Sequence, residues 1–409
     1  MTTPERTHKP LVALGLALVV FAAFSQFKLP VVLPVLLEDY GYGRVLAGGF
    51  MSIFAVFGIL LSVPIGRAVA RRGALLLVLA ALALMALGTA VCLAAPQSGA
   101  VMLAGRGLEG AAFAIIAVAG PALATANAAP RHRALVIGLV SAWVPCGQIL
   151  AALIGPLALN AGGWQSLWGV SLLLAALLAG WTLHALRRGP RGTTRRAAAA
   201  AAAPAPWSRA QWRALLLTGG VFMLWSGQYL AYMTWLPLYL VEVQQLAVET
   251  AIGGYLIPVV LVAVFNLTTG ALLQRGCRAQ HLLLGAVIVQ AAVWWLLPVT
   301  GGGLGGLASL AIYGITAGIA PTCLFALTAH LVASPGETAR AFGVTMTGRN
   351  LGVLGGPLLL ALAVEASGGW QAGSLLFAGI TTAAVALALV LVRVVPGVEA
   401  ESRAAAAAD

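Results

Sequence analysis

The sequence predicts an all-α membrane protein with twelve transmembrane helices, arranged as two pseudo-symmetric six-helix bundles. Three observations predict this fold class. The 409 residues are 61% hydrophobic and only 8% charged, whereas a soluble domain carries about 25% charged residues. Apolar runs long enough to cross a bilayer recur along the whole chain. Landmark residues of the first half also return in the second half at a nearly constant spacing.

Each helical crossing needs about 20 mostly apolar residues. In the first half this criterion predicts spans over 11–37, 45–66, 74–95, 99–128, 134–159 and 166–186. In the second half it predicts spans over 214–240, 250–273, 281–300, 304–332, 341–364 and 371–395. The runs are continuous rather than alternating between apolar and polar residues, so helices are favoured over the strands of an outer-membrane barrel. The composition excludes a soluble enzyme, a disordered chain and a secreted disulfide scaffold.

The basic residues predict the orientation of the spans. Nineteen of the 23 Lys and Arg residues fall in the N-terminus, the even-numbered loops and the C-terminal tail, and only Arg44 lies on the opposite side. The positive-inside rule therefore predicts cytoplasmic termini, in a multi-pass protein of the bacterial cytoplasmic (inner) membrane that contacts membrane lipids. The same rule accounts for the Arg-rich linker, so no nucleic-acid partner is expected.

Domain organisation follows from the same spans. We expect an N-terminal six-helix bundle over 1–186, a cytoplasmic Arg/Ala-rich linker over 187–213, and a C-terminal six-helix bundle with a short cytoplasmic tail over 214–409. The two bundles carry matching landmarks at offsets of 203, 204, 200 and 206 residues. The matched pairs are Pro34 and Pro237, Gly66 and Gly270, Pro121 and Pro321, and Gly163-Trp164-Gln165 and Gly369-Trp370-Gln371. Such a spacing is typical of a duplicated six-helix unit.

Short motifs lie in both halves, and those of the loops after spans 2 and 8 and of spans 5 and 11 lie at corresponding places. The loop after span 2 has the sequence Gly66-Arg67-Ala68-Val69-Ala70-Arg71-Arg72-Gly73, and the loop after span 8 has Gly270-Ala271-Leu272-Leu273-Gln274-Arg275-Gly276-Cys277-Arg278. Span 4 contains Arg106-Gly107-Leu108-Glu109-Gly110. Span 5 contains Gly147 and Gly155-Pro156, and span 11 contains Gly352-Val353-Leu354-Gly355-Gly356-Pro357.

Together these motifs resemble those of the major facilitator superfamily. The loops resemble the family pattern of glycine, three residues, aspartate and arginine, but Ala70 and Gln274 replace the aspartate. In the family this loop is implied to close the inner side through charge contacts, and the replacement removes that charge. Span 4 resembles the pattern of arginine, two residues, glutamine and glycine, with Glu109 replacing the glutamine. The resemblance implies the major facilitator fold and transport by alternating access.

The first two spans resemble one branch of that family. The segments Gln26-Phe27-Lys28-Leu29-Pro30 and Met51-Ser52-Ile53-Phe54 look most like the nitrate, nitrite and cyanate permease-like branch. This resemblance implies a small inorganic anion as the substrate.

Four ionisable side chains lie well inside the predicted spans: Lys28, Arg106, Glu109 and Arg349. A charge at the bilayer centre costs about 2.5–3.5 kcal/mol, so each is expected to have a partner or water. At a rise of about 1.5 Å per residue, all four lie roughly 10–18 Å below the outer face of the membrane. We therefore expect them to line one central cavity near the midplane, where such transporters bind substrate between their halves.

The charges of this set sum to +2, which favours an anionic substrate. Arginine suits a carboxylate or a planar oxyanion such as nitrate, nitrite or cyanate, because its fork donates two parallel hydrogen bonds. Lys28 would add a point charge and Asn350 a neutral donor. Glu109, the one acid of the set, is the expected proton carrier, so the predicted function is proton-coupled anion symport. The other predicted substrate contacts are Gln26, Gln228, Tyr229, Tyr232, Asn266 and Trp143.

Several alternatives stay open at this stage. Arg106 and Glu109 are three residues apart on one helix face, so in one alternative they form an ion pair and neutralise each other. Lys28 would otherwise extend outward to the membrane surface, and Arg349 would otherwise cap helix carbonyls. Single polar residues in spans commonly join helices. The alternative function is a proton-coupled exporter or antiporter of drugs or metabolites with the same fold.

A membrane-embedded enzyme is the third class of function. No span carries a His-Glu-x-x-His helix, a serine nucleophile motif or an acidic pair, so no enzymatic activity is expected. No metal or cofactor is required by any motif, and a monomer is expected.

Overall fold

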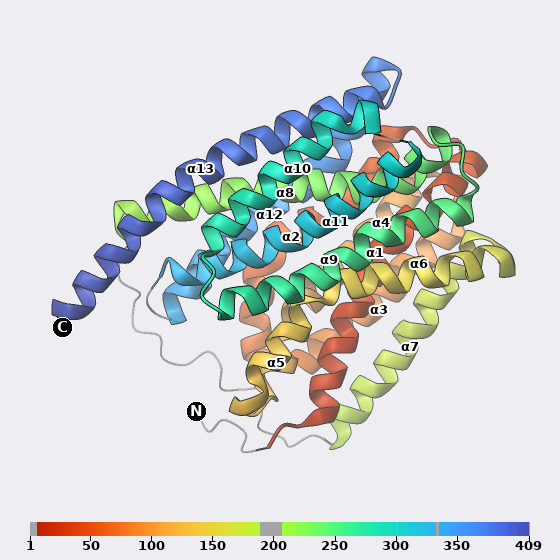
Figure 1. The fold of residues 1–409 in the computed structure, drawn as a ribbon. Helices are drawn as coiled ribbons and strands as arrows, with labels where there is room; N and C mark the ends of the chain where they lie inside the picture. Colours follow the sequence, from red (N-terminus) through yellow and green to blue (C-terminus); the bar gives the residue numbers. More distant parts are fainter. Residues whose placement is uncertain (1–5, 189–206, 301, 333–334, 409) are drawn as a thin grey trace. The chain divides into compact units, whose positions relative to one another are not determined.

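Helices form nearly all of the regular structure (Figure 1). The computed structural model describes residues 6–188, 207–300, 302–332 and 335–408, and these ranges contain helices and no strand. Twelve helices among them are long and apolar enough to cross a membrane, which confirms the predicted fold class. Most of the predicted linker over 187–213 lies outside the described residues.

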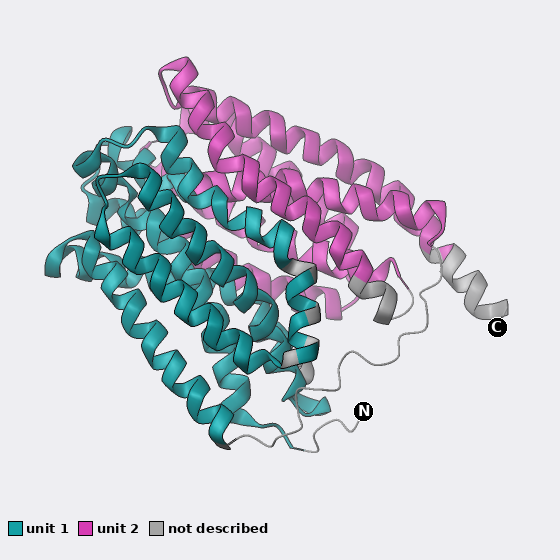
Figure 2. Ribbon diagram, turned by 180° about the vertical axis from the view of Figure 1, so that it is seen from behind, with its two compact units in different colours: residues 1–200, 234–256 teal, residues 201–233, 257–409 magenta. Residues whose placement is uncertain are grey.

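Contacts between residues divide the chain into two compact units (Figure 2). Unit 1 comprises residues 1–200 and 234–256, and unit 2 comprises residues 201–233 and 257–409. The predicted bundle boundaries at 186 and 214 stay a prediction. The first seven helices are α1 (Lys9–Tyr40), α2 (Arg44–Arg72), α3 (Ala74–Ala94), α4 (Gly99–Ala126), α5 (Pro130–Ser141), α6 (Trp143–Gly162) and α7 (Trp164–Arg188). The remaining six are α8 (Arg209–Glu242), α9 (Val248–Gln274), α10 (Ala279–Thr300), α11 (Gly303–His330), α12 (Pro335–Ser367) and α13 (Gln371–Ala408).

The predicted fifth span, 134–159, is wrong as a single helix. The structure divides it into α5 and α6, with Ala142 in a turn between them. Pro145 explains the break, because it has no backbone N–H for the carbonyl of Ser141 and its ring crowds that carbonyl. The Ala142 amide bonds the carbonyl of Leu139, three residues earlier, at 3.3 Å, which makes a tighter turn than that of an α-helix.

Helix packing within each unit shows the duplication directly. In unit 1, α3 packs against α4 and α7, and α6 packs against α7. In unit 2, α10 packs against α11 and α13, and α12 packs against α13. These are the same three neighbour pairs, counted as spans 3–4, 3–6 and 5–6 of each half. The offsets noted in the sequence therefore correspond to equivalent places in two similar bundles.

Glycines bring helices of unit 2 into direct backbone contact. A Cβ atom on Gly352 would collide with the carbonyl oxygen of Met223, and one on Gly356 would collide with the carbonyl oxygen of Gly227. A Cβ atom on Gly348 would likewise collide with Gly219. We call this contact between α8 and α12 the glycine seam. Small residues at such positions allow helices in a membrane to approach closely.

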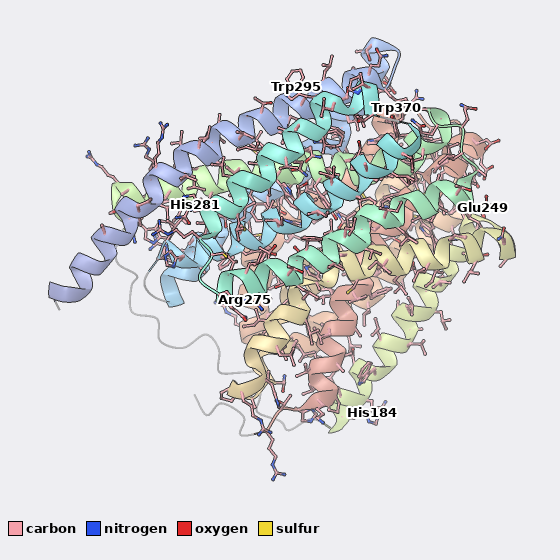
Figure 3. The ribbon with its side chains drawn as sticks, viewed as in Figure 1. His184, Glu249, Arg275, His281, Trp295 and Trp370 are labelled. Atoms are coloured by element: carbon pink, nitrogen blue, oxygen red, sulfur yellow. The ribbon has the colours of Figure 1, made fainter. Side chains whose placement is uncertain are left out.

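The helix surfaces suit a lipid environment. Large apolar side chains lie exposed on both units, among them Leu157 and Leu177 in unit 1 and Leu304 and Leu375 in unit 2. Such exposure is expected where lipid replaces water as the solvent. Figure 3 shows His184 and Glu249 at opposite ends of unit 1.

Candidate functional site

The carboxylate of Glu109 is the centre of a buried ion cluster in unit 1. Its Oε1 atom accepts hydrogen bonds from Lys28 Nζ and from Thr89 Oγ1, both at 2.7 Å. Its Oε2 atom accepts a bond from Arg106 at 2.6 Å. The side chains of Lys28, Arg106 and Glu109 are all fully buried. We call these three residues the charged cluster.

Lys28 is held from three sides. Besides Glu109, its Nζ atom donates to Ser171 Oγ on α7 at 3.0 Å. The same atom lies 4.4 Å from the ring centroid of Trp168, also on α7, which is a cation–π contact. The ammonium group therefore lies between α1, α4 and α7. The alternative in which Lys28 extends outward to the membrane surface is wrong in this structure.

Arg106 joins three helices through backbone carbonyls. Its guanidinium donates to the carbonyls of Ser25 at 2.9 Å and Gln26 at 3.0 Å on α1, and to that of Phe50 at 3.2 Å on α2. The carbonyl of Gln26 is available because Pro30, four residues later, has no N–H to bond it. With Glu109, these contacts use four of the five N–H donors of the arginine. The ring of Phe54 covers its face at 4.4 Å.

These contacts answer one question that the sequence left open. The i, i+3 pair of Arg106 and Glu109 exists, as the spacing allowed. Lys28 binds the same carboxylate, a contact that the sequence did not predict. The charged cluster thus carries one surplus positive charge, and its hydrogen-bonding atoms are mostly occupied within unit 1.

The other two predicted residues of unit 1 lie near this cluster. The backbone of Gln26 bonds Arg106. Trp143 begins α6 and packs on Phe113, with ring centroids 5.4 Å apart. Phe113 in turn contacts Phe54, which covers Arg106. Trp143 therefore belongs to an aromatic row that leads to the cluster.

In unit 2, Arg349 has a different environment. Its guanidinium donates to Asn350 Oδ1 at 3.0 Å, and its carbonyl accepts a bond from Ser226 Oγ on α8 at 2.8 Å. Tyr229 lies within electrostatic range of the guanidinium. Among the residues that the structure describes, no carboxylate lies within ion-pair distance of Arg349. Of the four ionisable residues predicted well inside the spans, Arg349 is the one with no described carboxylate within ion-pair distance.

Three predicted residues of α8 face an aromatic interior in unit 2. Gln228 is fully buried, and its Nε2 donates to the hydroxyl of Tyr313 at 3.0 Å. Tyr229 stacks on Trp225 at 5.0 Å, with an angle of 12° between the rings. Tyr232 packs edge-on against Tyr313 at 4.4 Å.

Asn266 contacts a neighbouring helix. Its Oδ1 atom accepts a hydrogen bond from Thr322 Oγ1 at 3.1 Å, which joins α9 to α11. This is the helix-joining role that is common for a single polar residue in a span.

Two groups form from the predicted site residues. Unit 1 brings together Lys28, Arg106, Glu109, Gln26 and Trp143, and unit 2 holds Arg349, Asn350, Gln228, Tyr229, Tyr232 and Asn266. That all of them line one shared cavity stays a prediction, as do their roles in binding substrate and protons.

Sequence reasoning missed Trp294, Tyr313 and Phe377 of unit 2, although the repeat offset indicates their positions. Positions about 204 residues after those of the charged cluster and its neighbours carry aromatic residues. The pairs are Lys28 and Tyr232, Thr89 and Trp294, Glu109 and Tyr313, and Ser171 and Phe377, at offsets of 204, 205, 204 and 206. Tyr232, Trp294, Tyr313 and Phe377 contact one another, and we call them the aromatic cluster.

A second ion pair lies in unit 1 at the start of α2. Arg44 donates to both carboxylate oxygens of Glu242 at 2.9 Å, and each side chain is about one third exposed. Partial exposure limits such a pair to about 1 kcal/mol. We expect Arg44→Glu to lower the melting temperature slightly, and the exchange Arg44→Glu with Glu242→Arg to restore it. An exchanged protein less stable than the single variant would contradict the pairing.

Comparisons with known proteins agree with the fold. The sequence profile of the Major Facilitator Superfamily matches residues 15–357. In structure, the chain is similar to a bacterial homologue of the human lysosomal transporter Spinster in an inward-facing, unoccupied conformation. The TM-score is 0.70 and the identity 17%, and the match covers 98% of each chain.

The relatives found by sequence match only part of this chain. A putative uncharacterized transporter, YgaY, of Escherichia coli K12 is 28% identical over 184 residues, which are 44% of this chain and 45% of that protein. A probable multidrug-efflux transporter of Mycobacterium tuberculosis is 30% identical over 157 residues, which are 38% of this chain and 33% of that protein. Each match spans less than half the length of the relative.

Proposed function

Because the chain belongs to the major facilitator superfamily, we propose that it is a secondary active transporter that moves a small anion together with protons. The substrate class is a carboxylate or an inorganic oxyanion. The proposed place of work is the bacterial inner membrane, with both termini in the cytoplasm and the protein acting as a monomer. The placement in the nitrate, nitrite and cyanate permease-like branch stays a prediction.

The observation that carries this proposal is Arg349. A cation inside a membrane span is costly unless a negative charge or water offsets it. Lys28 and Arg106 share Glu109, but no described carboxylate pairs with Arg349. An anionic substrate would supply the missing charge, and the guanidinium fork suits a carboxylate or nitrate. Asn350, already bonded to Arg349, would hold the fork in place.

The proposed proton carrier is Glu109. Its carboxylate, on α4, bonds residues of α1, α3 and α4, and its partner Lys28 also bonds Ser171 on α7. Lys28 Nζ occupies Oε1, so proton uptake there requires Lys28 to move away first. Movement of Lys28 away from Oε1 is therefore the step that would accompany proton uptake.

Uptake by proteoliposomes tests the anion proposal. An inward proton gradient should drive accumulation of at least one anion among nitrate, nitrite, cyanate and small carboxylates. Loss of one charge-assisted hydrogen bond, about 1.5–3 kcal/mol, should make the rate of Arg349→Gln roughly ten- to a hundredfold lower. The uptake rate of Arg349→Lys should lie between those of the parent protein and Arg349→Gln, because lysine keeps the positive charge but lacks the two-pronged guanidinium.

Arg393→Gln is the matched control, since Arg393 is exposed on α13. It should transport like the parent protein. Equal uptake by Arg349→Gln and the parent would contradict the proposal.

A second candidate function is export of drugs or metabolites by proton antiport. Two observations favour it: the match to a protein named as a probable multidrug-efflux transporter, and the aromatic cluster of unit 2, whose rings suit lipophilic cargo. Competition for binding by lipophilic cations alone, with no effect of anions, would support this candidate over the first.

A further inference from the structure

We propose that the beginnings of α8 and α12 form a binding site for the headgroup of an anionic phospholipid. The inference concerns the lipid around the protein and does not depend on which cargo is carried. Three features of unit 2 carry it: an exposed row on α8 that is basic at its start and apolar further on, an arginine of α12 beside that row, and hydrogen bonds that fix the start of α8. We call Arg209, Trp212, Arg213 and Arg340 the basic patch.

One face of α8 is exposed over its first two turns. The exposed residues on it are Arg209, Trp212, Arg213 and Leu216. Their spacing of three and four residues places them in one row along the helix. Trp212 is 41% exposed and Leu216 60%, whereas the intervening Leu215 is fully buried. The row is therefore open to whatever surrounds the protein.

This row passes from the level of the lipid headgroups into the hydrocarbon core. The predicted span covers 214–240, so Arg209 and Arg213 precede it and Leu216 lies inside it. Tryptophan is enriched at the boundary between these two layers, which is where Trp212 lies. The orientation that the basic residues predict places this end of α8 in the cytoplasmic leaflet. Anionic lipids of that leaflet attract basic residues close to the membrane.

Arg340 comes from α12 and meets the same place. Its guanidinium carbon lies 4.4 Å from the ring centroid of Trp207. Trp207 in turn packs edge-on against Trp212, with ring centroids 4.7 Å apart. Arg340 directly precedes the predicted span over 341–364, just as Arg213 directly precedes that of α8. The arginines of the two helices therefore lie at the same level of the membrane and flank one pair of tryptophan rings.

Hydrogen bonds hold the start of α8 in a fixed position. The backbone N–H of Gln211 donates to Ser208 Oγ at 3.1 Å, and the backbone N–H of Ser208 donates to Gln211 Oε1 at 2.9 Å. This reciprocal pair is a capping box. Gln211 Nε2 also donates to the carbonyl of Leu331, just after α11, at 3.3 Å. A surface fixed in this way loses little conformational freedom when it binds a ligand.

The charge of the basic patch favours a lipid with a net negative headgroup. Its three arginines carry three positive charges, and no described carboxylate lies within ion-pair distance of Arg209 or Arg213. A guanidinium donates two parallel hydrogen bonds to a phosphate. A zwitterionic lipid carries a cation beside its phosphate, which this patch repels. A soluble phosphate would contact the arginines alone, whereas the acyl chain of a lipid also covers Trp212 and Leu216.

Native mass spectrometry of the purified full-length protein tests the proposed lipid. The probes are phosphatidylglycerol, phosphatidylcholine with the same acyl chains, and glycerol 3-phosphate as a soluble phosphate. We expect the tightest-bound phosphatidylglycerol to bind at least about tenfold more tightly than phosphatidylcholine, because each basic residue near the surface adds about fivefold. Glycerol 3-phosphate at the same concentration should not displace it. Equal affinities for the two lipids, or displacement by glycerol 3-phosphate, would overturn the inference.

Variants then locate the site. Arg209→Gln with Arg213→Gln should weaken phosphatidylglycerol binding roughly tenfold to thirtyfold, and Arg340→Gln about fivefold. The matched control is Arg275→Gln with Arg278→Gln, which removes the same charge from the exposed loop after α9, on the same predicted side (Figure 3). It should bind the lipid within about twofold of the parent protein. Equal losses in the two double variants, or unchanged binding by Arg340→Gln, would overturn the inference.

Melting separates a binding role of these arginines from a purely structural one. A ligand that binds only the folded protein raises its melting temperature. Added phosphatidylglycerol should therefore raise the melting temperature of the parent protein and of the control variant more than that of the variant at Arg209 and Arg213. In lipid-free detergent these three proteins should melt alike. An equal rise in all three on addition of the lipid would overturn the inference.

Discussion

Glu109→Gln should produce the largest loss of stability of any single charge change in this chain. The substitution leaves the ammonium of Lys28 and the guanidinium of Arg106 fully buried without their shared anion. Removing one partner of a buried ion pair costs about 3–5 kcal/mol, because the remaining charge has no compensation. The melting temperature of the purified protein should fall by many degrees, and accumulation of substrate driven by a proton gradient should cease.

A matched control lies on α1. Glu38 is exposed, so Glu38→Gln should melt within about 1 kcal/mol of the parent protein. The double variant Lys28→Gln with Glu109→Gln should be more stable than Glu109→Gln alone, since it also removes one of the two uncompensated charges. A Glu109→Gln protein as stable as Glu38→Gln would contradict the cluster. One that still accumulates substrate against a gradient would contradict the proton role.

Gly356→Ala and Gly355→Ala should change stability in opposite directions. A Cβ atom on Gly356 would strike the backbone of Gly227, and backbone cannot rotate away. Overpacking of this kind costs about 1–3 kcal/mol. A Cβ atom on Gly355 meets only the side chain of Leu359 at 3.7 Å. Since alanine favours helix over glycine, Gly355→Ala should be neutral or stabilising by up to about 1 kcal/mol.

Melting of the two purified variants checks this prediction, and the comparison cancels the change in helix propensity, which both share. Transport should also differ, because the glycine seam positions Arg349 beside α8. Equal melting temperatures for both variants would show that α8 and α12 do not touch at Gly356.

The fold was largely predictable from the sequence because membrane crossing depends on the length and polarity of single segments. Eleven predicted spans each correspond to one helix, whereas 134–159 corresponds to α5 and α6, whose break at Ala142 follows from Pro145. The charge bias and the repeat offset are also properties of the chain itself. None of these inferences needs knowledge of which side chains meet.

The site was less predictable because its contacts cross between helices. The spacing of Arg106 and Glu109 on one helix predicted their pair, since residues three apart share a face. Nothing in the spacing indicated that Lys28, on another helix, would reach the same carboxylate. Likewise the partners Thr89, Ser171 and Trp168 are ordinary span residues until packing brings them together.

The contact between Arg106 and the carbonyl of Gln26 has a consequence for how this protein can change over generations. Pro30 exposes the carbonyl, and Arg106 covers it. A chain that loses the arginine keeps an unsatisfied carbonyl in the buried interior of unit 1, and a chain that loses the proline gives that carbonyl back to its own helix. Pro30 and Arg106 are therefore expected to be retained or replaced together during evolution.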